Sequence, residues 1–255
     1  MKILLWNVNG VRAINKKKVY NEKTFEEYIY SKKCDFICLN ETKIDEEKVK
    51  ENNILDKYKY KYYSCASKKG YSGVAIFTNN KPISSIVNWD NEGRVCILEY
   101  KNFILVCVYV VNSGTKLKRL DYRLSWDKKF HNLVYKLRKN KKVIICGDMN
   151  VASEDIDIYK AAGHERTAGF TIEEKTSFKK LCKSFIDSYR YLYPHKQEFT
   201  YYDYRSKARS RNAGWRIDSF LIDERIINKV NKIKIDNKVT GSDHLSIICD
   251  IEINI

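Results

Sequence analysis

The chain has little of what divides a protein into parts: only two prolines and ten glycines in 255 residues. No proline-, glycine- or serine-rich linker interrupts it and no internal repeat is found, so we expect one domain over residues 1–255. The longest apolar run, residues 103–111, is far too short to span a membrane. The N-terminus lacks the hydrophobic region and small-residue cleavage site of a signal peptide. We therefore expect a protein that is neither membrane-bound nor secreted. Its place would be the cytoplasm or nucleoid of a bacterium, or otherwise a nucleus or a viral factory.

The eight cysteines do not suggest a disulfide framework. Five of them lie inside apolar, strand-like runs, where a free thiol behaves as a small hydrophobic side chain: Cys38, Cys96, Cys107, Cys146 and Cys249. Cys34 and Cys38 have no partner pair at zinc-site spacing. The pattern favours a reducing compartment and argues against a zinc site.

The net charge of +16 suits a polyanionic partner, of which nucleic acid is the commonest. Lysine, asparagine, isoleucine and tyrosine are abundant throughout, so compositional bias is an alternative explanation of the charge. Arginine is scarce elsewhere but clusters at 119–123 and 205–216, which bias does not explain. Charge of this kind supports binding and says nothing about catalysis.

Hydrophobic periodicity predicts strands interleaved with helices. We expect strands at 2–8, 35–40, 71–78, 94–100, 103–111, 143–146, 215–222 and 245–253. Helices are expected at 22–33, 120–140 and 171–183, the last with a capping box of Thr171 and Glu174, and a charged helix or loop at 45–60. Because hairpins are mixed among the helices, the order indicates an α/β sandwich of two mixed sheets flanked by helices.

Polar side chains follow the predicted strand 143–146. Gly147 allows a sharp change of direction, and alternation puts Asp148 and Asn150 on the same side of an extended backbone. A carboxylate and a carboxamide at the end of a core strand are suited to positioning a water or a phosphate. An Asx-rich turn is the alternative explanation.

The same arrangement recurs near the ends of six predicted strands. The residues concerned are Asn7, Glu41, Tyr109, Asn112, Asp148, Asn150, Asp218, Asp243 and His244. If these ends converge, they supply carboxylates for a hard cation, amides for a phosphate, and an acid–imidazole pair. That combination is typical of a phosphodiesterase.

At these residues the chain resembles the exonuclease III / apurinic-apyrimidinic (AP) endonuclease family of the endonuclease–exonuclease–phosphatase superfamily. The matching segments, in family order over essentially the whole chain, are 6–13, 39–43, 70–74, 92–95, 109–112, 119–123, 146–152, 168–171, 214–221 and 241–244. The resemblance implies a four-layered, DNase I-like α/β sandwich.

The resemblance also implies roles for the strand-end residues. Glu41 is expected to be the principal Mg²⁺ ligand, with Asn9 and Asp243 near a second metal position, and Asn9 in place of aspartate removes one carboxylate. Asp148 is expected to orient or deprotonate the attacking water, assisted by Asn150 and Asn7. Tyr109, Asn112 and His244 are expected to contact the scissile phosphate, and Asp218 to pair with His244. Asp148, Asn150, Asn7 and His244 are counted as further metal-site residues.

DNA contacts and a lesion pocket are expected from the same resemblance. The DNA-binding arginines would be Arg94, Arg119, Arg123, Arg205, Arg209 and Arg216. Tyr201, Trp215 and Ile217 would line a small pocket for an abasic deoxyribose. The alternative is that Trp215 and Ile217 simply alternate into the core along strand 215–222.

The expected function is a DNA repair nuclease that hydrolyses the phosphodiester 5′ to abasic sites, with 3′-5′ exonuclease and 3′-phosphodiesterase activity in base excision repair. One or two Mg²⁺ ions would act, with Mn²⁺ as a substitute, on double-stranded DNA that carries abasic sites or 3′ blocks, and the enzyme would be a monomer. The alternatives are secreted DNase I-like enzymes, inositol-phosphate or sphingomyelin phosphatases, RNA deadenylases, and a non-catalytic DNA-binding relative. The presence of Glu41, Asp148, Asn150 and His244 argues against the last.

Overall fold

The computed structural model describes residues 1–255 as two six-stranded sheets packed face to face, with one small two-stranded ribbon. The first sheet has the order β13-β14-β1-β4-β6-β5, with β1 (Lys2–Asn7), β4 (Phe36–Asn40), β5 (Tyr60–Ser64), β6 (Val74–Thr78), β13 (Val230–Ile235) and β14 (Ile247–Ile251). The second has the order β11-β12-β10-β9-β8-β7, with β7 (Ser84–Ile86), β8 (Val95–Glu99), β9 (Phe103–Tyr109), β10 (Lys142–Asp148), β11 (Phe185–Asp187) and β12 (Asp218–Asp223). The ribbon pairs β2 (Lys18–Tyr20) with β3 (Lys23–Thr24).

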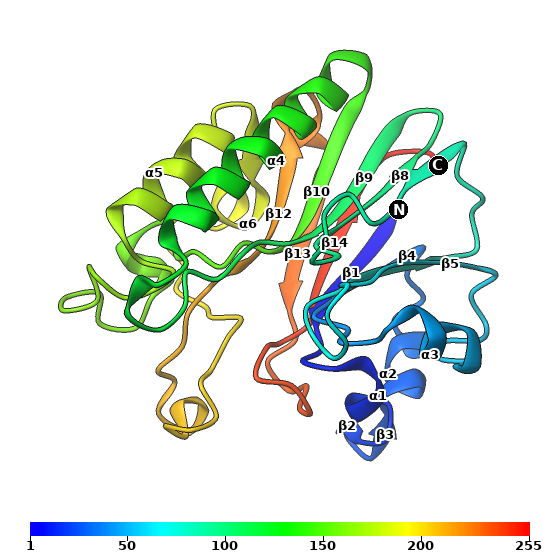
Figure 1. Ribbon diagram of the computed structural model, residues 1–255, viewed down its shortest axis with the longest axis horizontal. Coiled ribbons are helices and arrows are strands. Elements are labelled where there is room, and N and C mark those ends of the chain that lie inside the picture. Colours follow the sequence, from blue (N-terminus) through cyan, green and yellow to red (C-terminus); the bar gives the residue numbers. More distant parts are fainter.

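Helices cover the outer faces of both sheets. They are α1 (Val11–Ile14), α2 (Phe25–Ser31), α3 (Glu46–Glu51), α4 (Leu120–Asn140), α5 (Ile172–Leu181) and α6 (Ser188–Leu192). Figure 1 shows α4 and α5 side by side over the second sheet, and α1 to α3 gathered beside the first. On α4 the buried face is formed by Trp126, Phe130 and Val134, which pack onto the second sheet. On α2 it is formed by Phe25, Tyr28 and Ile29.

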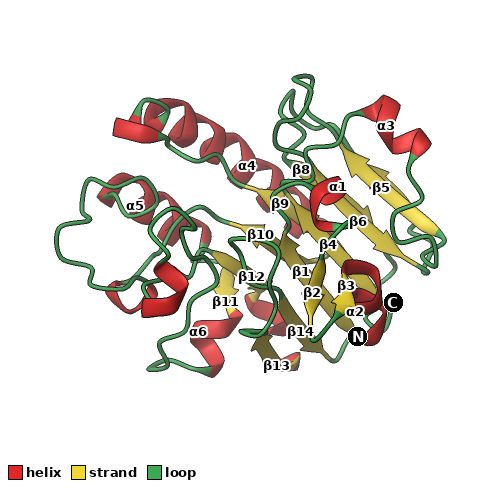
Figure 2. Cartoon of the chain, turned by 90° about the horizontal axis from the view of Figure 1, so that it is seen from below, coloured by secondary structure: helices red, strands yellow, loops and turns green.

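Both sheets are mixed, and each contains one parallel pair at its centre. β1 runs parallel to β4, and β9 runs parallel to β10, while the other pairs are antiparallel. Parallel strands buried on both faces read as continuous apolar runs, as these four do. The turned view in Figure 2 shows the two sheets stacked between their helices. The predicted fold, two mixed sheets flanked by helices, is confirmed.

Several predicted boundaries were wrong. The strand predicted at 71–78 begins at Val74, since Ser72 and Gly73 have left-handed backbone conformations. The strand predicted at 215–222 begins at Asp218, because Trp215 forms only isolated bridges with Ile158 and Tyr201. The edge strands β5, β7, β11 and β13 were not predicted: they are short or carry many exposed polar residues, so their apolar signal is weak. The capping box of Thr171 and Glu174 is confirmed.

The two chain ends lie close together (Figure 1), and the Met1 ammonium donates to the Ile251 carbonyl oxygen at 2.9 Å. None of the helices combines the length and apolar character needed to cross a lipid bilayer.

Candidate active site

The candidate site lies where the two central parallel pairs end. The carboxyl ends of β1 and β4 deliver Asn7 and Glu41, and those of β9 and β10 deliver Tyr109 and Asp148. Gly147 allows β10 to pack closely beside β9, since a Cβ atom there would stand 1.7 Å from the Val108 carbonyl oxygen. The facing sheets thus bring residues that are far apart in sequence to one edge.

Asp148 is held on every side by the protein. Asn7 donates from Nδ2 to its Oδ2 at 3.0 Å, and the Asn150 backbone N–H donates to its Oδ1 at 2.8 Å. Its own backbone N–H donates to Asn40 Oδ1 at 2.8 Å. Asp148 is only 2% exposed, so its orientation is set before any substrate arrives.

His244 stands between two carboxylates. Its Nδ1 lies 2.8 Å from Asp218 Oδ2, and its Nε2 lies 3.8 Å from Asp148 Oδ2. Asp218 Oδ1 is buried and has no hydrogen-bond partner. The three side chains form a compact, buried acid–imidazole–acid cluster.

Burial and charge set the protonation of this cluster. Burial and the charge of Asp218 raise the pKa of Asp148, against the lowering effect of His244 and of its hydrogen bonds, to about 7. Burial lowers the pKa of His244, but the charges of Asp218 and Asp148 and the Asp218 hydrogen bond outweigh it and raise the pKa to about 10. Burial also raises the pKa of Tyr109 well above its ordinary value. At neutral pH the site therefore offers a base, an imidazolium and a neutral phenol.

The oxygen atoms for a hard cation lie beside this cluster. Lys43 Nζ stands 3.0 Å from Glu41 Oε1 and 2.5 Å from Asn9 Oδ1, and Asn9 donates to Asp243 Oδ1 at 3.1 Å. These carboxylate and amide oxygens are the ligand types that Mg²⁺ prefers, and two of them, on Glu41 and Asn9, already contact one cation, the lysine ammonium. The donor set therefore fits a divalent metal at Glu41, Asn9 and Asp243.

Left-handed backbone conformations mark the same place. Asn9, Glu41 and Asn150 have φ values of 48°, 55° and 48°. Non-glycine residues in this region carry strain, and such residues cluster at functional sites.

The amides predicted to assist the water or the metal are largely occupied within the protein. Asn7 is 0% exposed, and its Oδ1 accepts the Asn9 backbone N–H at 3.1 Å. Asn150 donates from Nδ2 to the Val110 carbonyl at 2.8 Å and accepts from Asn112 Nδ2 at 2.7 Å. In this arrangement Asn7 and Asn150 orient Asp148 and Asn112, and the exposed Asn112 is the amide that faces solvent.

A pocket of about 410 Å³ opens over the cluster. It is lined by Glu41, Tyr109, Asn112, Asp148, Asn150, Thr167, Ala168, Gly169, Tyr201, Asp203, Trp215, Ile217, Asp243 and His244. Tyr201 packs on His244 with ring centroids 4.9 Å apart, and Trp215 contacts His164 and Phe170 edge-on. The three predicted pocket residues therefore line one cavity together with Asp148 and His244.

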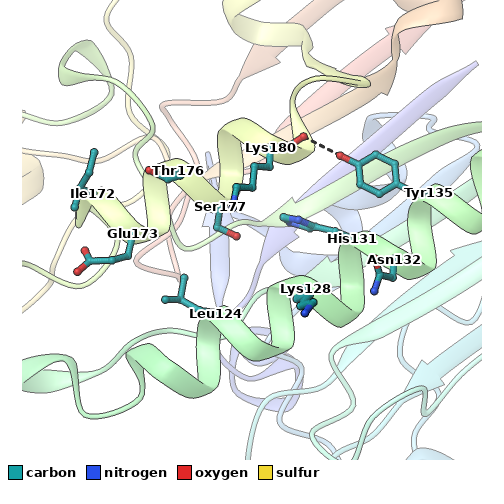
Figure 3. Close-up of a pocket in the computed structure, with 10 residues that line it drawn as sticks. All are labelled: Leu124, Lys128, His131, Asn132, Tyr135, Ile172, Glu173, Thr176, Ser177 and Lys180. Atoms are coloured by element: carbon teal, nitrogen blue, oxygen red, sulfur yellow. Dashed lines mark hydrogen bonds between the residues drawn. The ribbon is translucent and has the colours of Figure 1, made fainter.

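A larger hollow of about 700 Å³ lies between α4 and α5 (Figure 3), where Tyr135 Oη donates to the Lys180 carbonyl at 2.8 Å. It contains none of the predicted site residues.

Three of the predicted DNA-binding arginines are buried in ion pairs, which corrects the prediction. Arg94 is 2% exposed and donates to Glu92 and to the Tyr109 carbonyl. Arg216 is 3% exposed and pairs with Asp157 and Asp187. Because their guanidinium groups are enclosed and neutralised, they are not available to a DNA phosphate.

Arg123 is the third. It is 2% exposed and holds the chain after β9 and after β10, donating to the carbonyl oxygens of Val111, Asn150 and Met149 at 2.6, 3.2 and 2.9 Å. Asp127 accepts from its Nε at 2.8 Å. Its role in the structure is to fasten the two loops that carry site residues.

The other predicted arginines are accessible to different degrees. Arg205 is exposed, whereas Arg209 is half-buried and donates to the Asn237 carbonyl at 2.6 Å. Arg119 is half-buried and donates to Glu92 and to the Tyr71 hydroxyl.

Four residues at the site were missed in the sequence. Lys43, Tyr71 and Phe170 lie within the recognised motifs, so those motifs were the signal that could have identified them. Asn40, which holds the Asp148 backbone, lies in the motif 39–43 as well, where it forms the polar end of an apolar strand.

Comparison with known proteins identifies the family of this chain. A model of the endonuclease/exonuclease/phosphatase family matches residues 4–244. The chain belongs to this family. Family membership and the sandwich fold, both expected from the motifs, are confirmed.

The relatives of this family member include an exodeoxyribonuclease of Bacillus subtilis, 37% identical over 99% of the chain and 98% of the relative. A DNA-(apurinic or apyrimidinic site) endonuclease of Dictyostelium discoideum is 39% identical over 100% of the chain and 71% of the relative. Among solved structures, the AP endonuclease LMAP of Leishmania major superposes with a TM-score of 0.85 at 29% identity, covering 97% of this chain and 86% of that one.

Proposed function

We propose that the chain is a DNA repair nuclease that hydrolyses the phosphodiester 5′ to abasic sites. The observation that carries the proposal is the shared cavity: Asp148 and His244 of the acid–imidazole cluster and the residues Tyr201, Trp215 and Ile217 line the same hollow of about 410 Å³. The names of its relatives, exodeoxyribonuclease and AP endonuclease, support the same substrate. The net charge of +16 is consistent with DNA as partner.

Asp148 would act as the general base. A pKa of about 7 lets it take a proton from water at neutral pH, and its hydrogen bonds to Asn7 and Asn150 fix its direction. The water oxygen then attacks phosphorus in line, and the bond to the 3′ oxygen of the preceding nucleotide breaks. The products are a 3′ hydroxyl and a 5′ phosphate on the abasic residue.

Protonated His244 would stabilise the charge that builds on the phosphate. Asp218 keeps the imidazole protonated and fixes its orientation from Nδ1, leaving Nε2 to donate. The phenol of Tyr109 and the exposed amide of Asn112 line the same cavity and would supply neutral donors. Mg²⁺, or Mn²⁺ in its place, bound by Glu41 with Asn9 and Asp243 would neutralise phosphate oxygens and stabilise the leaving alkoxide.

The abasic pocket would select the substrate. Tyr201, Trp215 and Ile217 form an apolar wall with Phe170 and Ile158, which suits a deoxyribose without a base. An unpaired abasic sugar leaves the helix at lower cost than an intact nucleotide. The same centre would remove 3′ blocks and nucleotides from DNA ends. We further propose that the enzyme acts as a monomer inside the cell.

The decisive experiment is incision of a labelled duplex carrying one tetrahydrofuran abasic analogue, with Mg²⁺ or with a chelator. We expect one nick 5′ to the analogue in Mg²⁺ and none in chelator, while a matched intact duplex stays uncut. Asp148→Asn should slow the nick by about 10²–10⁴, the range for loss of a positioned base, with DNA binding retained. Equal cutting of both duplexes, or an Asp148→Asn enzyme of normal rate, would contradict the proposal.

A further inference from the structure

Three free thiols from distant parts of the chain meet between the two sheets. Cys38 of β4 comes from one sheet, and Cys107 of β9 and Cys146 of β10 come from the other. Cys107 and Cys146 are direct partners in the parallel pair, so they stand side by side on the same face. The three sulfur atoms all lie within 4.8 Å of one another, and all three residues are 0% exposed.

The surroundings of this thiol cluster (Cys38, Cys107 and Cys146) are buried and mostly apolar. In register, Cys38 is flanked by Leu5 and Ile76 on its sheet, and Cys146 by Phe220 on the other. A further thiol, Cys96 of β8, is paired in register with Cys107 of β9 but is not part of the group of three. The cluster belongs to neither the acid–imidazole site nor its pocket lining.

One polar side chain reaches the cluster, and it donates. Asn40 Nδ2 lies 3.3 Å from Cys107 Sγ, while its Oδ1 accepts the Asp148 backbone N–H. The amide donor favours the thiolate form of Cys107, whereas the Leu39 carbonyl oxygen, 3.9 Å from the same sulfur, accepts from the thiol form. Burial raises the pKa of Cys107, but the hydrogen bonds from Cys146, Cys38 and Asn40 to its sulfur outweigh burial and lower that pKa.

We propose that Cys38, Cys107 and Cys146 form a buried three-sulfur site for one soft monovalent cation of the Cu(I) class. Thiolate ligands select Cu(I) and Zn²⁺ among common metals, but structural Zn²⁺ is almost always four-coordinate and tetrahedral. The cluster offers three sulfurs and no fourth donor, which suits a three-coordinate soft ion. Sequence spacing could not reveal this site because its ligands come from three strands.

Binding changes no oxidation state. Cysteine ligates metals as the thiolate, so each coordinating thiol that is still protonated releases its proton as H⁺ when the ion binds.

The test measures copper retained by the folded protein and does not depend on nuclease activity. Metal-free protein is equilibrated anaerobically with Cu(I) supplied from bicinchoninate, at a denaturant concentration below the unfolding transition where local opening admits the ion. It is then desalted and its copper counted. We expect one Cu(I) per chain, and X-ray absorption at the copper edge should report sulfur as the only ligand type.

Variants separate the cluster from the other five cysteines. Cys38→Ala and Cys146→Ala should each retain at least tenfold less copper, whereas Cys249→Ala, a control buried in the same core but outside the group, should retain the wild-type amount. Circular dichroism checks that each variant is folded. If a variant does not fold, the ligand type reported by X-ray absorption on the wild-type protein tests the proposal instead. No retained copper, nitrogen or oxygen ligands, or equal retention in the cluster variants would overturn the proposal.

Discussion

The pairing of Asp218 with His244 predicts that His244 is protonated at neutral pH and that this depends on Asp218. His244 has a pKa of about 10 against an ordinary value of 6.5. At about 1.36 kcal/mol per pKa unit, that difference corresponds to about 5 kcal/mol of net stabilisation of the imidazolium by its carboxylate neighbours. Asp218 makes the largest favourable contribution, while burial opposes it. Asp218→Asn should therefore lower the pKa of His244 by several units, to below neutrality.

Nuclear magnetic resonance titration of the histidine ring protons measures this directly, because the chain has only four histidines. His131, which lies in α4 outside the pocket, serves as the internal reference. Asp203→Asn is the matched control, since Asp203 lines the same pocket and makes no hydrogen bond to His244. Nicking by Asp218→Asn should fall by about 10² or more at neutral pH, because the imidazolium that would stabilise the phosphate charge is lost.

The same change affects stability with a defined sign. A group whose pKa is raised on folding contributes stability that is fully present below its unfolded pKa and is lost as the pH rises through the folded value. The stability gap between wild type and Asp218→Asn should therefore be widest below about pH 6.5 and narrow towards pH 10. A His244 pKa that stays near 10 in the variant would refute the reasoning.

Three further predictions concern the metal site, the packing of β10 against β9, and DNA binding by the basic surface. Glu41→Ala should raise the Mg²⁺ concentration needed for half-maximal nicking while the melting temperature holds; an unchanged Mg²⁺ titration would remove Glu41 from the metal site. Gly147→Ala should cost about 3 kcal/mol or more in urea unfolding, the upper range for overpacking, because its Cβ would collide with the Val108 carbonyl; Gly163→Ala, where no atom lies within 4 Å but φ is +87°, should show only the cost of a left-handed alanine and so lose less. A plot of log K for DNA against log salt should fall with a slope of about −0.9 for each phosphate neutralised; a flat plot would mean that the +16 charge is compositional.

The strand-end residues could be predicted because their signal is local. An apolar run followed by a polar residue can be read without knowing what lies opposite, and the parallel pairs then bring Asn7, Glu41, Tyr109 and Asp148 to one edge. The motifs added the order and the family. Helix α4 was predictable for the same reason, since its apolar face repeats at helical spacing.

What could not be predicted depends on partners distant in sequence. The cluster at 205–216 contains Arg216, but only the fold places Asp157 and Asp187 against it and turns a surface charge into a buried one. Arg94 and Arg123 were misassigned in the same way. The edge strand β13 alternates apolar with exposed lysine and asparagine residues, so it becomes evident only when β14 is present to pair with it.

The fastening of two loops by Arg123 has a consequence for local opening. Two backbone hydrogen bonds, from Val110 N–H to the Asp148 carbonyl and from Met149 N–H to the Ile217 carbonyl, hold the starts of the segments after β9 and β10. One guanidinium bridges the carbonyl oxygens of these segments to the outer helix α4. Arg123→Lys keeps the charge but lacks the planar fork that binds several acceptors at once. In that variant, amide hydrogen exchange should quicken at residues 110–112 and 149–151 while the centre of β10 stays protected. Through Arg123, helix α4 on the outside of the sandwich therefore limits how often the loops after β9 and β10 open locally.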